Sequence, residues 1–307
     1  MRIVSLLPST TEIVCALGLE DELVGITHEC DYPRSVGDKP RLTASRISHE
    51  TMTSAEIDHA VRSQLDGHGS IYNLDEAKLR ELKPDLILTQ ELCEVCAVSY
   101  KKVQHAARSF EADVTVVSLE PNTIDDIFAN IRLVGELTNR VQRAAELINE
   151  LTSRLQAVRS RTEVISNRPL TLMLEWLEPP FAPGHWVPEQ VALAGGDHAF
   201  GKAGQRSVTT TAEEIRAYAP EVIVLIPCGY YKEDILRQLA DANLPEGWND
   251  LPAVKTNQVW AVDATSYFSR PGPRVVDGVE ILAKILHPEV SGSPTSDEAV
   301  RVSEARP

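Results

Sequence analysis

The chain has 307 residues, of which 43% are hydrophobic and 24% are charged, and this composition suits one large or two ordinary globular domains with full cores. Acidic residues outnumber basic residues by 45 to 30, which gives a formal net charge of -15 at pH 7. Because this charge repels nucleic-acid phosphates and anionic membrane surfaces, it argues against nucleic acid as a partner.

The amino-terminal sequence MRIVSLLPSTTE contains one arginine and an apolar run, Ile3 to Leu7, that ends at Pro8. A signal peptide needs a longer apolar core, and a membrane-spanning helix needs about 20 apolar residues. We therefore expect no membrane insertion and a cytoplasmic location as the sequence is written, or a periplasmic or extracytoplasmic one if an export segment has been removed. Five cysteines, an odd number, do not indicate a disulfide framework.

The first elements predict a β-α-β unit. The apolar runs Ile3–Leu7 and Leu23–Ile26 are typical of parallel strands that are covered on both faces. Between them, Ser9 and Glu12 have the spacing of a capping box, and the helical pattern that follows ends at Gly18. Further strands are expected at 85–89 and 114–117.

A long helical region follows. Residues 123–161 contain no proline, and their apolar side chains recur at steps of three and four, with a break expected at 135–139. At 1.5 Å per residue, the part from 140 to 161 would span roughly 30 Å, about the width of one domain. It could therefore bridge two lobes.

One segment of the second half repeats a segment of the first. Residues 79–88, LRELKPDLIL, align without a gap with residues 215–224, IRAYAPEVIV, so that helix end, proline, acid and buried strand recur in order. Any junction between a helix and a strand could use proline followed by an acid. We favour two similar lobes, and Thr211 with Glu214 forms a capping box before the second copy.

Ligands of open parallel α/β sheets bind beyond the carboxyl ends of the strands, so residues at those ends are the candidates for a site. Ser9, Thr10 and Glu12 stand at a helix amino terminus, where they could hold a ligand or merely cap the helix. The turn after the second strand contains four more candidates, namely His28, Glu29, Cys30 and Tyr32.

Cys93 and Cys96 follow the strand that ends at Thr89. Together with Cys30 and His28 they could complete a Cys3His set for zinc or iron, although a single Cys-x-x-Cys pair could equally line a ligand pocket or be buried as a hydrophobe. Acidic neighbours at 91 and 94 would raise the thiol pKa values, which argues against a redox pair.

The second half places aromatic side chains near predicted strand ends, an arrangement that suits a large flat ligand but also suits an ordinary core. The candidates are Trp186, Tyr230, Tyr231 and Tyr267, with Arg270 as a partner for an anionic group or a solvated side chain. The sequence lacks the Gly-x-Ser-x-Gly, Walker, Gly-x-Gly-x-x-Gly and His-Glu-x-x-His patterns. We therefore expect no enzymatic activity.

Five stretches resemble the substrate-binding proteins of vitamin B12 and iron-siderophore ABC importers, in particular the cobalamin-binding branch. They are SLLPSTTEIVCALGLEDELVGITHECDYP, LKPDLILTQ, PEQVALAGG, APEVIVLIP and RPGPRVVDGVEILAKIL, and the similarity covers residues 1 to about 287. The resemblance implies the class III periplasmic-binding-protein fold: α/β, with two Rossmann-like lobes of parallel sheet, a long bridging α-helix and a ligand cleft between the lobes. The outline read from the residues is the same.

We accordingly expect an N-terminal lobe over 1–121, a helical linker over 122–167, a C-terminal lobe over 168–287 and a disordered tail over 288–307, which is rich in Ser, Pro and charge. The resemblance implies a monomer that binds a corrinoid or another large metal chelate and needs no resident cofactor. It also implies a possible ABC permease partner, which would dock on Glu213 and, less clearly, Glu76.

Two features depart from the family pattern. Residues 47–70 look like an insertion, and the Cys and His elements at 28–30 and 93–96 are not needed for the fold. They leave open a second hypothesis, in which the chain is a cytoplasmic metal-binding or enzymatic derivative of the fold that holds zinc or iron.

Overall fold

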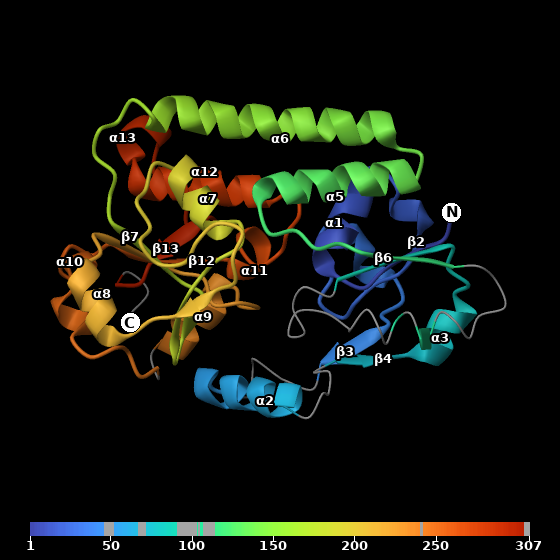
Figure 1. Ribbon diagram of the computed structural model, residues 1–307, viewed down its shortest axis with the longest axis horizontal. Helices are drawn as coiled ribbons and strands as arrows, with labels where there is room; N and C mark the ends of the chain where they lie inside the picture. The colour runs from blue at the N-terminus through green and yellow to red at the C-terminus, as the bar shows by residue number, and fades with distance from the viewer. Residues whose placement is uncertain are drawn as a thin grey trace. The chain divides into compact units, whose positions relative to one another are not determined.

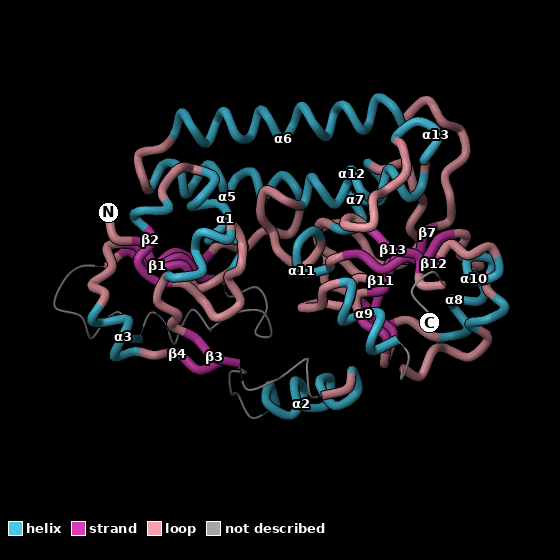
Figure 2. The backbone as a smooth tube through the Cα atoms, turned by 180° about the vertical axis from the view of Figure 1, so that it is seen from behind, coloured by secondary structure: helices cyan, strands magenta, loops and turns pink. Residues whose placement is uncertain are grey.

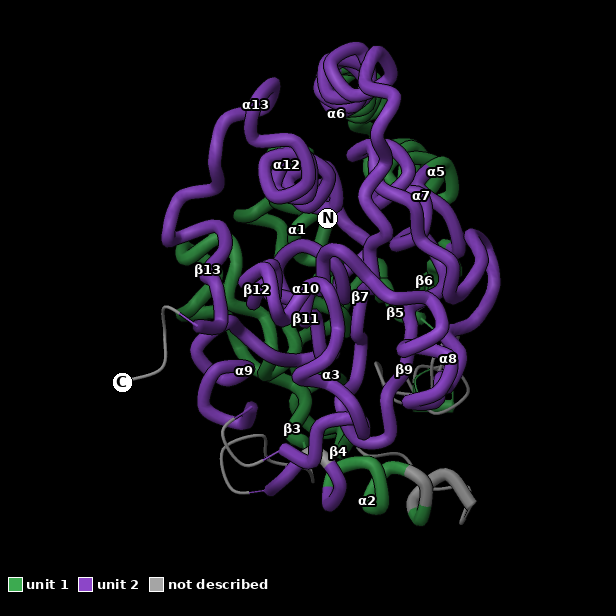
Figure 3. Tube along the Cα trace, turned by 90° about the vertical axis from the view of Figure 1, so that its left-hand side faces the viewer, with its two compact units in different colours: residues 1–50, 57–121, 125–149 green, residues 51–56, 122–124, 150–307 purple. Residues whose placement is uncertain are grey.

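The computed structural model describes residues 1–45, 52–66, 72–90, 103, 105–106, 114–239 and 242–303. The chain divides into two compact units (Figure 3). Unit 1 contains residues 1–50, 57–121 and 125–149, and unit 2 contains residues 51–56, 122–124 and 150–307. Both units are built around a four-stranded sheet.

The sheet of unit 1 is parallel throughout and has the order β2-β1-β5-β6. Every side chain of β1 and β5 is buried, as expected for apolar runs that are covered on both faces. Helices α1 and α5 lie on one side of this sheet and α3 on the other (Figures 1 and 2). The strands are β1 (Ile3–Ser5), β2 (Leu23–Gly25), β5 (Leu86–Thr89) and β6 (Thr115–Ser118), with an antiparallel pair of β3 (Thr43–Ser45) and β4 (Tyr72–Leu74).

The helices up to residue 162 include the predicted long pair. They are α1 (Pro8–Ala16), α2 (Ser54–Asp66), α3 (Glu76–Glu81), α5 (Ile124–Leu137) and α6 (Val141–Thr162), with 3-10 turns at Glu20–Glu22 and Arg34–Asp38. The expected break between α5 and α6 is confirmed, and a Cβ at Gly135 would lie 2.6 Å from the Cβ of Ala144. Helix α6 begins in unit 1 and ends in unit 2.

The capping box expected at Ser9 and Glu12 is wrong. Helix α1 begins at Pro8, and Leu7 at its N-cap makes no side-chain cap bond. Proline fits the first helical position because that position has no intrahelical partner for an amide. The second expected box, Thr211 with Glu214, is confirmed at the start of α8.

The sheet of unit 2 has the order β13-β12-β11-β7, in which β7, β11 and β12 are parallel and β13 is antiparallel. Helices α7 and α12 lie side by side on one side of it, and α9 lies on the other (Figures 1 and 2). Three short strands form a separate antiparallel sheet, β10-β9-β8. The strands of unit 2 are β7 (Thr171–Leu174), β8 (Trp176–Leu177), β9 (Pro180–Ala182), β10 (Val208–Thr209), β11 (Val222–Leu225), β12 (Val259–Val262) and β13 (Ala299–Arg301).

Short helices connect these strands. They are α7 (Val187–Leu193), α8 (Ala212–Tyr218), α9 (Lys232–Leu239), α10 (Pro252–Lys255), α11 (Ala264–Tyr267), α12 (Val275–Leu286) and α13 (Pro288–Ser291), with a 3-10 turn at Trp248–Asp250. Arg154 of α6 forms ion pairs with Asp277 and Glu280 of α12. These ion pairs fix the carboxyl-terminal half of α6 to unit 2. Among the described residues, no helix combines the length and the apolar character that crossing a bilayer requires.

The prediction of a disordered tail from residue 288 is wrong as far as Ser303. Helix α13 and strand β13 lie in this segment, and β13 pairs with β12 in register from Trp260 to Val262. Its apolar side chains Ala299 and Val302 are buried, and the Arg301 guanidinium lies 4.7 Å from the Trp260 ring centroid. The Ser, Pro and charge content of the tail predicted disorder, but three residues are enough to form an edge strand once a partner strand exists.

The internal repeat extends to the backbone. Lys83 and Ala219, which precede the aligned prolines, both have positive φ, at 43° and 50°. The aligned acids then make the same contact: Asp85 accepts a hydrogen bond from the amide of Arg2 at 2.7 Å, and Glu221 accepts one from the amide of Leu170 at 2.9 Å. Each acid thus fixes the start of the neighbouring strand, and the prediction of two similar halves is confirmed.

Candidate functional site

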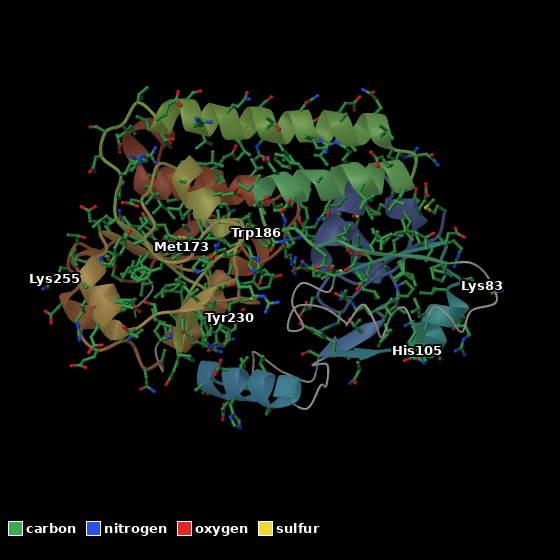
Figure 4. All side chains as sticks on the ribbon, in the orientation of Figure 1. Lys83, His105, Met173, Trp186, Tyr230 and Lys255 are labelled. Atoms are coloured by element: carbon green, nitrogen blue, oxygen red, sulfur yellow. The ribbon has the colours of Figure 1, made fainter. Side chains whose placement is uncertain are left out.

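The parallel strands of each unit's four-stranded sheet share a carboxyl edge, at which the loops after them gather. In Figure 4, Lys255 of α10 lies at one edge of unit 2, away from Trp186 and Tyr230. Helix α10 adjoins the start of β11, where the amide of Ala253 donates to Pro220, whereas Tyr230 follows the end of β11. In unit 1, β2 pairs with one side of β1, and β5, which comes later in the chain, pairs with the other side. The strand order therefore reverses at β1, and ligands of open parallel sheets bind at such a switch point.

A buried network of hydroxyl and thiol groups lies beneath the carboxyl edge of unit 1. The hydroxyls of Thr10 and Thr11 both hydrogen-bond with Ser5, and the Thr11 Oγ1 lies 3.1 Å from the Cys30 Sγ. Cys30 is 1% exposed, and its sulfur is also within 3.5 Å of the Thr27 hydroxyl. The hydroxyl and thiol groups of this network therefore have hydrogen-bond partners within unit 1.

These contacts bear on the zinc or iron hypothesis. Cys93 and Cys96 lie outside the described residues. Within the described part of the chain, no group of three or more His, Cys, Asp or Glu side chains is arranged to hold a metal ion. Burial raises the pKa of the Cys15 thiol to about 12, with the nearby charge of Glu20 adding to the effect.

Ser9 and Glu12 are buried, at 3% exposure each, and so is Thr10 at 1%. They belong to the first turns of α1, directly after β1. Their contact with a ligand stays a prediction, because the structure shows them inside unit 1 and shows the Thr10 hydroxyl bonded to Ser5 and to the carbonyl of Leu7.

His28 and Glu29 form a polar cluster at the same edge with three residues that the sequence did not single out. The Nδ1 of His28 lies 2.7 Å from the Thr43 Oγ1, which also accepts a hydrogen bond from the His28 amide at 3.1 Å. The Tyr72 hydroxyl donates to Glu29 Oε1 at 3.2 Å, and the rings of His28 and Tyr72 have centroids 5.6 Å apart. Arg41 donates to the carbonyl of His28.

The electrostatics of this cluster favour a neutral imidazole. Burial lowers the pKa of His28, and the charge of Arg41 lowers it further. The side chain is still 26% exposed, so the ring is oriented and reachable. Farther along the turn, Tyr32 is 47% exposed.

In unit 2, Trp186 and Gln190 connect the start of α7 to the segment before α12. The indole N–H of Trp186 donates to the carbonyl of Phe268 at 2.9 Å, and the Gln190 amide donates to the carbonyls of Tyr267 and Val275 at 3.0 and 2.8 Å. Trp186 is 6% exposed. The structure therefore gives Trp186 a packing role, and its contact with a ligand stays a prediction.

The other predicted aromatic residues lie around the ends of β11 and β12. Tyr230 is fully buried, and its ring meets that of Trp176 edge-on at 5.6 Å. Tyr231 and Tyr267 are half-buried, and the Arg274 guanidinium lies 6.0 Å from the Tyr267 ring centroid. Arg270 is buried, at 7% exposure. The structure thus brings these residues to one region of unit 2, where their ligand contacts stay predictions.

Glu175 was missed by the sequence reading, although it directly follows β7. Its Oε2 is buried and has no hydrogen-bond partner among the described residues, while the carboxyl group hydrogen-bonds with Ser207. Burial raises its pKa, and the Ser207 bond only partly offsets this. The rule that candidates follow strand ends would have found it, because Leu174 is the last residue of the strand.

We expect Glu175→Gln to stabilise the protein at neutral pH. A carboxyl whose pKa is raised on folding contributes its full stability below its ordinary pKa and loses it as the pH rises through the raised value. The free energy of unfolding of the wild type should therefore fall with pH relative to the variant, by at most about 1.4 kcal/mol per pH unit. Urea denaturation from pH 4 to pH 8 measures the difference.

The control is Glu213→Gln, at an exposed glutamate of α8. Its unfolding curves should follow those of the wild type across the same range. A constant difference between wild type and Glu175→Gln at every pH would show that the Glu175 proton has no part in stability.

The comparisons with known proteins agree on one family. A family model described as periplasmic binding protein matches residues 3–265. The vitamin B12-binding protein of Vibrio cholerae is 27% identical over 289 residues, which cover 93% of this chain and 88% of that protein. An uncharacterized ABC transporter substrate-binding lipoprotein of Bacillus subtilis, YvrC, is 26% identical, with 94% and 80% covered.

Solved structures show the same fold. The periplasmic vitamin B12-binding protein BtuF of Vibrio cholerae matches with a TM-score of 0.65 at 24% identity, over 95% of this chain and 98% of that one. A periplasmic heme-binding protein from Pseudomonas aeruginosa matches with a TM-score of 0.72 at 18% identity, over 94% and 93%. These likenesses extend over nearly the whole chain.

Proposed function

Because this chain belongs to the periplasmic binding protein family, we propose that it binds a large metal chelate, with a cobalamin-like corrinoid as the expected ligand, and breaks no covalent bond of the macrocycle. The observation that carries the proposal is the 27% identity to a vitamin B12-binding protein across 93% of this chain. Heme-binding proteins are also among the structural neighbours, so an iron porphyrin is the second candidate. The second hypothesis, a metal-binding or enzymatic derivative of the fold that holds zinc or iron, depends on Cys93 and Cys96, which lie outside the described residues.

We propose that the loops that follow the strands of each sheet contact the ligand. Flat, partly apolar chelates are held by aromatic side chains and a few polar groups. Tyr32 in unit 1 and Tyr231 and Tyr267 in unit 2 are aromatic and at least partly exposed, which supports this placement. The buried candidates would support these loops from within each unit; they are Ser9, Thr10 and Glu12 in unit 1 and Trp186, Tyr230 and Arg270 in unit 2.

The exposure of Glu213 and Glu76 at the start of equivalent helices supports a docking role for them. Glu213 lies in the first turn of α8 and Glu76 in the first turn of α3, and the N-caps Thr211 and Asp75 align, although the residue that aligns with Glu213 itself is Ala77, next to Glu76. We propose that the two carboxylates contact the permease of an ABC importer, one from each unit. A delivery function of this kind places the protein outside the cytoplasm and works with a monomer.

Titration with cyanocobalamin, heme and a ferric siderophore, followed by intrinsic fluorescence, tests the proposal. We expect saturable one-to-one binding of the corrinoid. Tyr32→Ser should weaken it by about tenfold, because truncating an aromatic contact in a binding site costs more than about 1 kcal/mol. The same change should leave the free energy of unfolding within about 0.5 kcal/mol of the wild type, since the side chain is exposed.

Val164→Ser is the matched control, at a hydrophobic residue that is 78% exposed in unit 2. It should change neither stability nor binding. Equal affinity of Tyr32→Ser and wild type would remove Tyr32 from the site. A wild type that binds none of the three chelates would refute the proposed function itself.

A further inference from the structure

The imidazole of His28 has the surroundings of a metal ligand, although the described part of the chain holds no metal-binding cluster around it. Its Nδ1 is held by the Thr43 hydroxyl at 2.7 Å, and its ring packs against Tyr72. Nε2, on the opposite side of the ring, lies 3.9 Å from Glu29 Oε1, which is beyond hydrogen-bond distance. One nitrogen is thus fixed by the protein while the other is left for a further partner.

Metal-ligating histidines typically have this division of roles. The nitrogen that does not touch the metal bonds to a fixed polar group, which sets the tautomer and the direction of the ring. The Thr43 oxygen accepts from the His28 amide, and its second lone pair can accept from an Nδ1–H. In that tautomer Nε2 carries a lone pair.

A single histidine is too few to build a metal site, since zinc needs three or four protein ligands. It is sufficient where the metal already sits in a macrocycle and lacks only an axial ligand, as in heme and corrinoid centres. Glu29 Oε1 accepts a hydrogen bond from the Tyr72 hydroxyl at 3.2 Å and lies 3.9 Å from Nε2, so it makes no hydrogen bond to that nitrogen. The geometry around His28 therefore fits a preformed chelate better than a free ion.

We propose that His28 is an axial ligand, through Nε2, to the metal of a bound tetrapyrrole-type chelate, and that Thr43 is the positioning residue that directs the ring. This inference rests on the proposed function and narrows it to chelates that have an exchangeable axial position. On binding, the axial water leaves the metal, the Nε2 lone pair takes its place, and no electron is transferred. A hexadentate siderophore complex leaves no such position and cannot bind in this way.

The test compares aquocobalamin, whose axial water can be replaced, with cyanocobalamin, whose two axial positions are filled. The visible spectrum of aquocobalamin should change to that of an imidazole adduct on binding to the wild type, and the cyanocobalamin spectrum should not. His28→Gln should abolish the change and weaken aquocobalamin binding by about tenfold or more, while cyanocobalamin affinity stays the same. Thr43→Val should keep the spectral change but weaken aquocobalamin binding by about tenfold.

His105→Gln, at an exposed histidine, is the control and should match the wild type with both cobalamins. A parallel titration with ferric heme distinguishes an iron porphyrin from a cobalt corrinoid, since only the ligand that reaches His28 acquires the imidazole spectrum. Binding of aquocobalamin without any spectral change in the wild type would overturn the axial role and leave the proposed function intact. Equal weakening of both cobalamins by His28→Gln would also overturn it, and failure of the wild type to bind any chelate would refute both.

Discussion

Gly184→Ala is expected to lower the free energy of unfolding by about 3 kcal/mol or more, the upper range for a residue forced into a packed interior. A Cβ at this position would lie 2.1 Å from the carbonyl oxygen of Gln205 and 2.8 Å from that of Arg206. Both obstacles are backbone atoms, so no side-chain rotation relieves them. A hydrogen bond from the His185 amide to the carbonyl oxygen of Gln205, at 2.6 Å, also joins the two segments.

Gly37→Ala provides the matched control, because a Cβ there would meet nothing within 4 Å. It should leave stability unchanged or raise it slightly, since alanine reduces the freedom of the unfolded chain. Chemical denaturation of the two variants measures the contrast. Similar stabilities for both would mean that the chain around Gly184 is not packed against residues 205–207.

Trp186→Ala should cost about 3–5 kcal/mol, the range for removing a large buried aromatic side chain. The indole is 6% exposed and provides the N–H that bonds to the carbonyl of Phe268. Trp186→Phe keeps most of the apolar contact and loses only the hydrogen bond, so its cost should be nearer 1 kcal/mol. Urea denaturation of both variants tests the ordering.

The alternative reading of Trp186 is a side chain that is free to contact a ligand. In that case Trp186→Ala would leave the free energy of unfolding within about 1 kcal/mol of the wild type and would reduce ligand affinity instead. The two readings therefore separate on stability alone, before any ligand is added.

The strands and the long helices could be predicted because their signals are local. Fully apolar runs such as Leu86–Thr89 are buried on both faces, and the three-four spacing after Thr123 gave α5 and α6 with the break between them. The repeat was visible because proline and an acidic residue, Asp85 or Glu221, precede each buried strand, and the backbone repeats with it, since the residue before each proline has a positive φ. These features depend on neighbouring residues alone.

The candidate site was harder to predict because its partners are distant in sequence. His28 is oriented by Thr43, 15 residues later, and Glu29 by Tyr72, 43 residues later. Neither partner lies at the end of a buried strand, so no rule about strand ends could select it. Glu175 does lie there, but a single glutamate after an apolar run carries no sign that its carboxylate will be buried.

The carboxyl-terminal tail was predicted to be disordered but is ordered as far as Ser303. Its Ser, Pro and charged residues suggested disorder, yet Ala299–Arg301 completes the sheet against β12 and Lys284 pairs with Glu298. Those contacts depend on a sheet edge made by residues about forty positions earlier, which composition cannot reveal. The thiol pair Cys93 and Cys96, for which the sequence left open a metal site, a pocket wall and a buried position, lies outside the described residues, so its role stays a prediction.

The most direct measurement of the central claim is native mass spectrometry of the full chain with an equimolar mixture of cobalamin, heme and a ferric siderophore. A binding protein for a corrinoid should select one molecule of cobalamin from the mixture and leave the other two chelates unbound. Recovery of the bare chain under conditions that preserve the fold would contradict the claim.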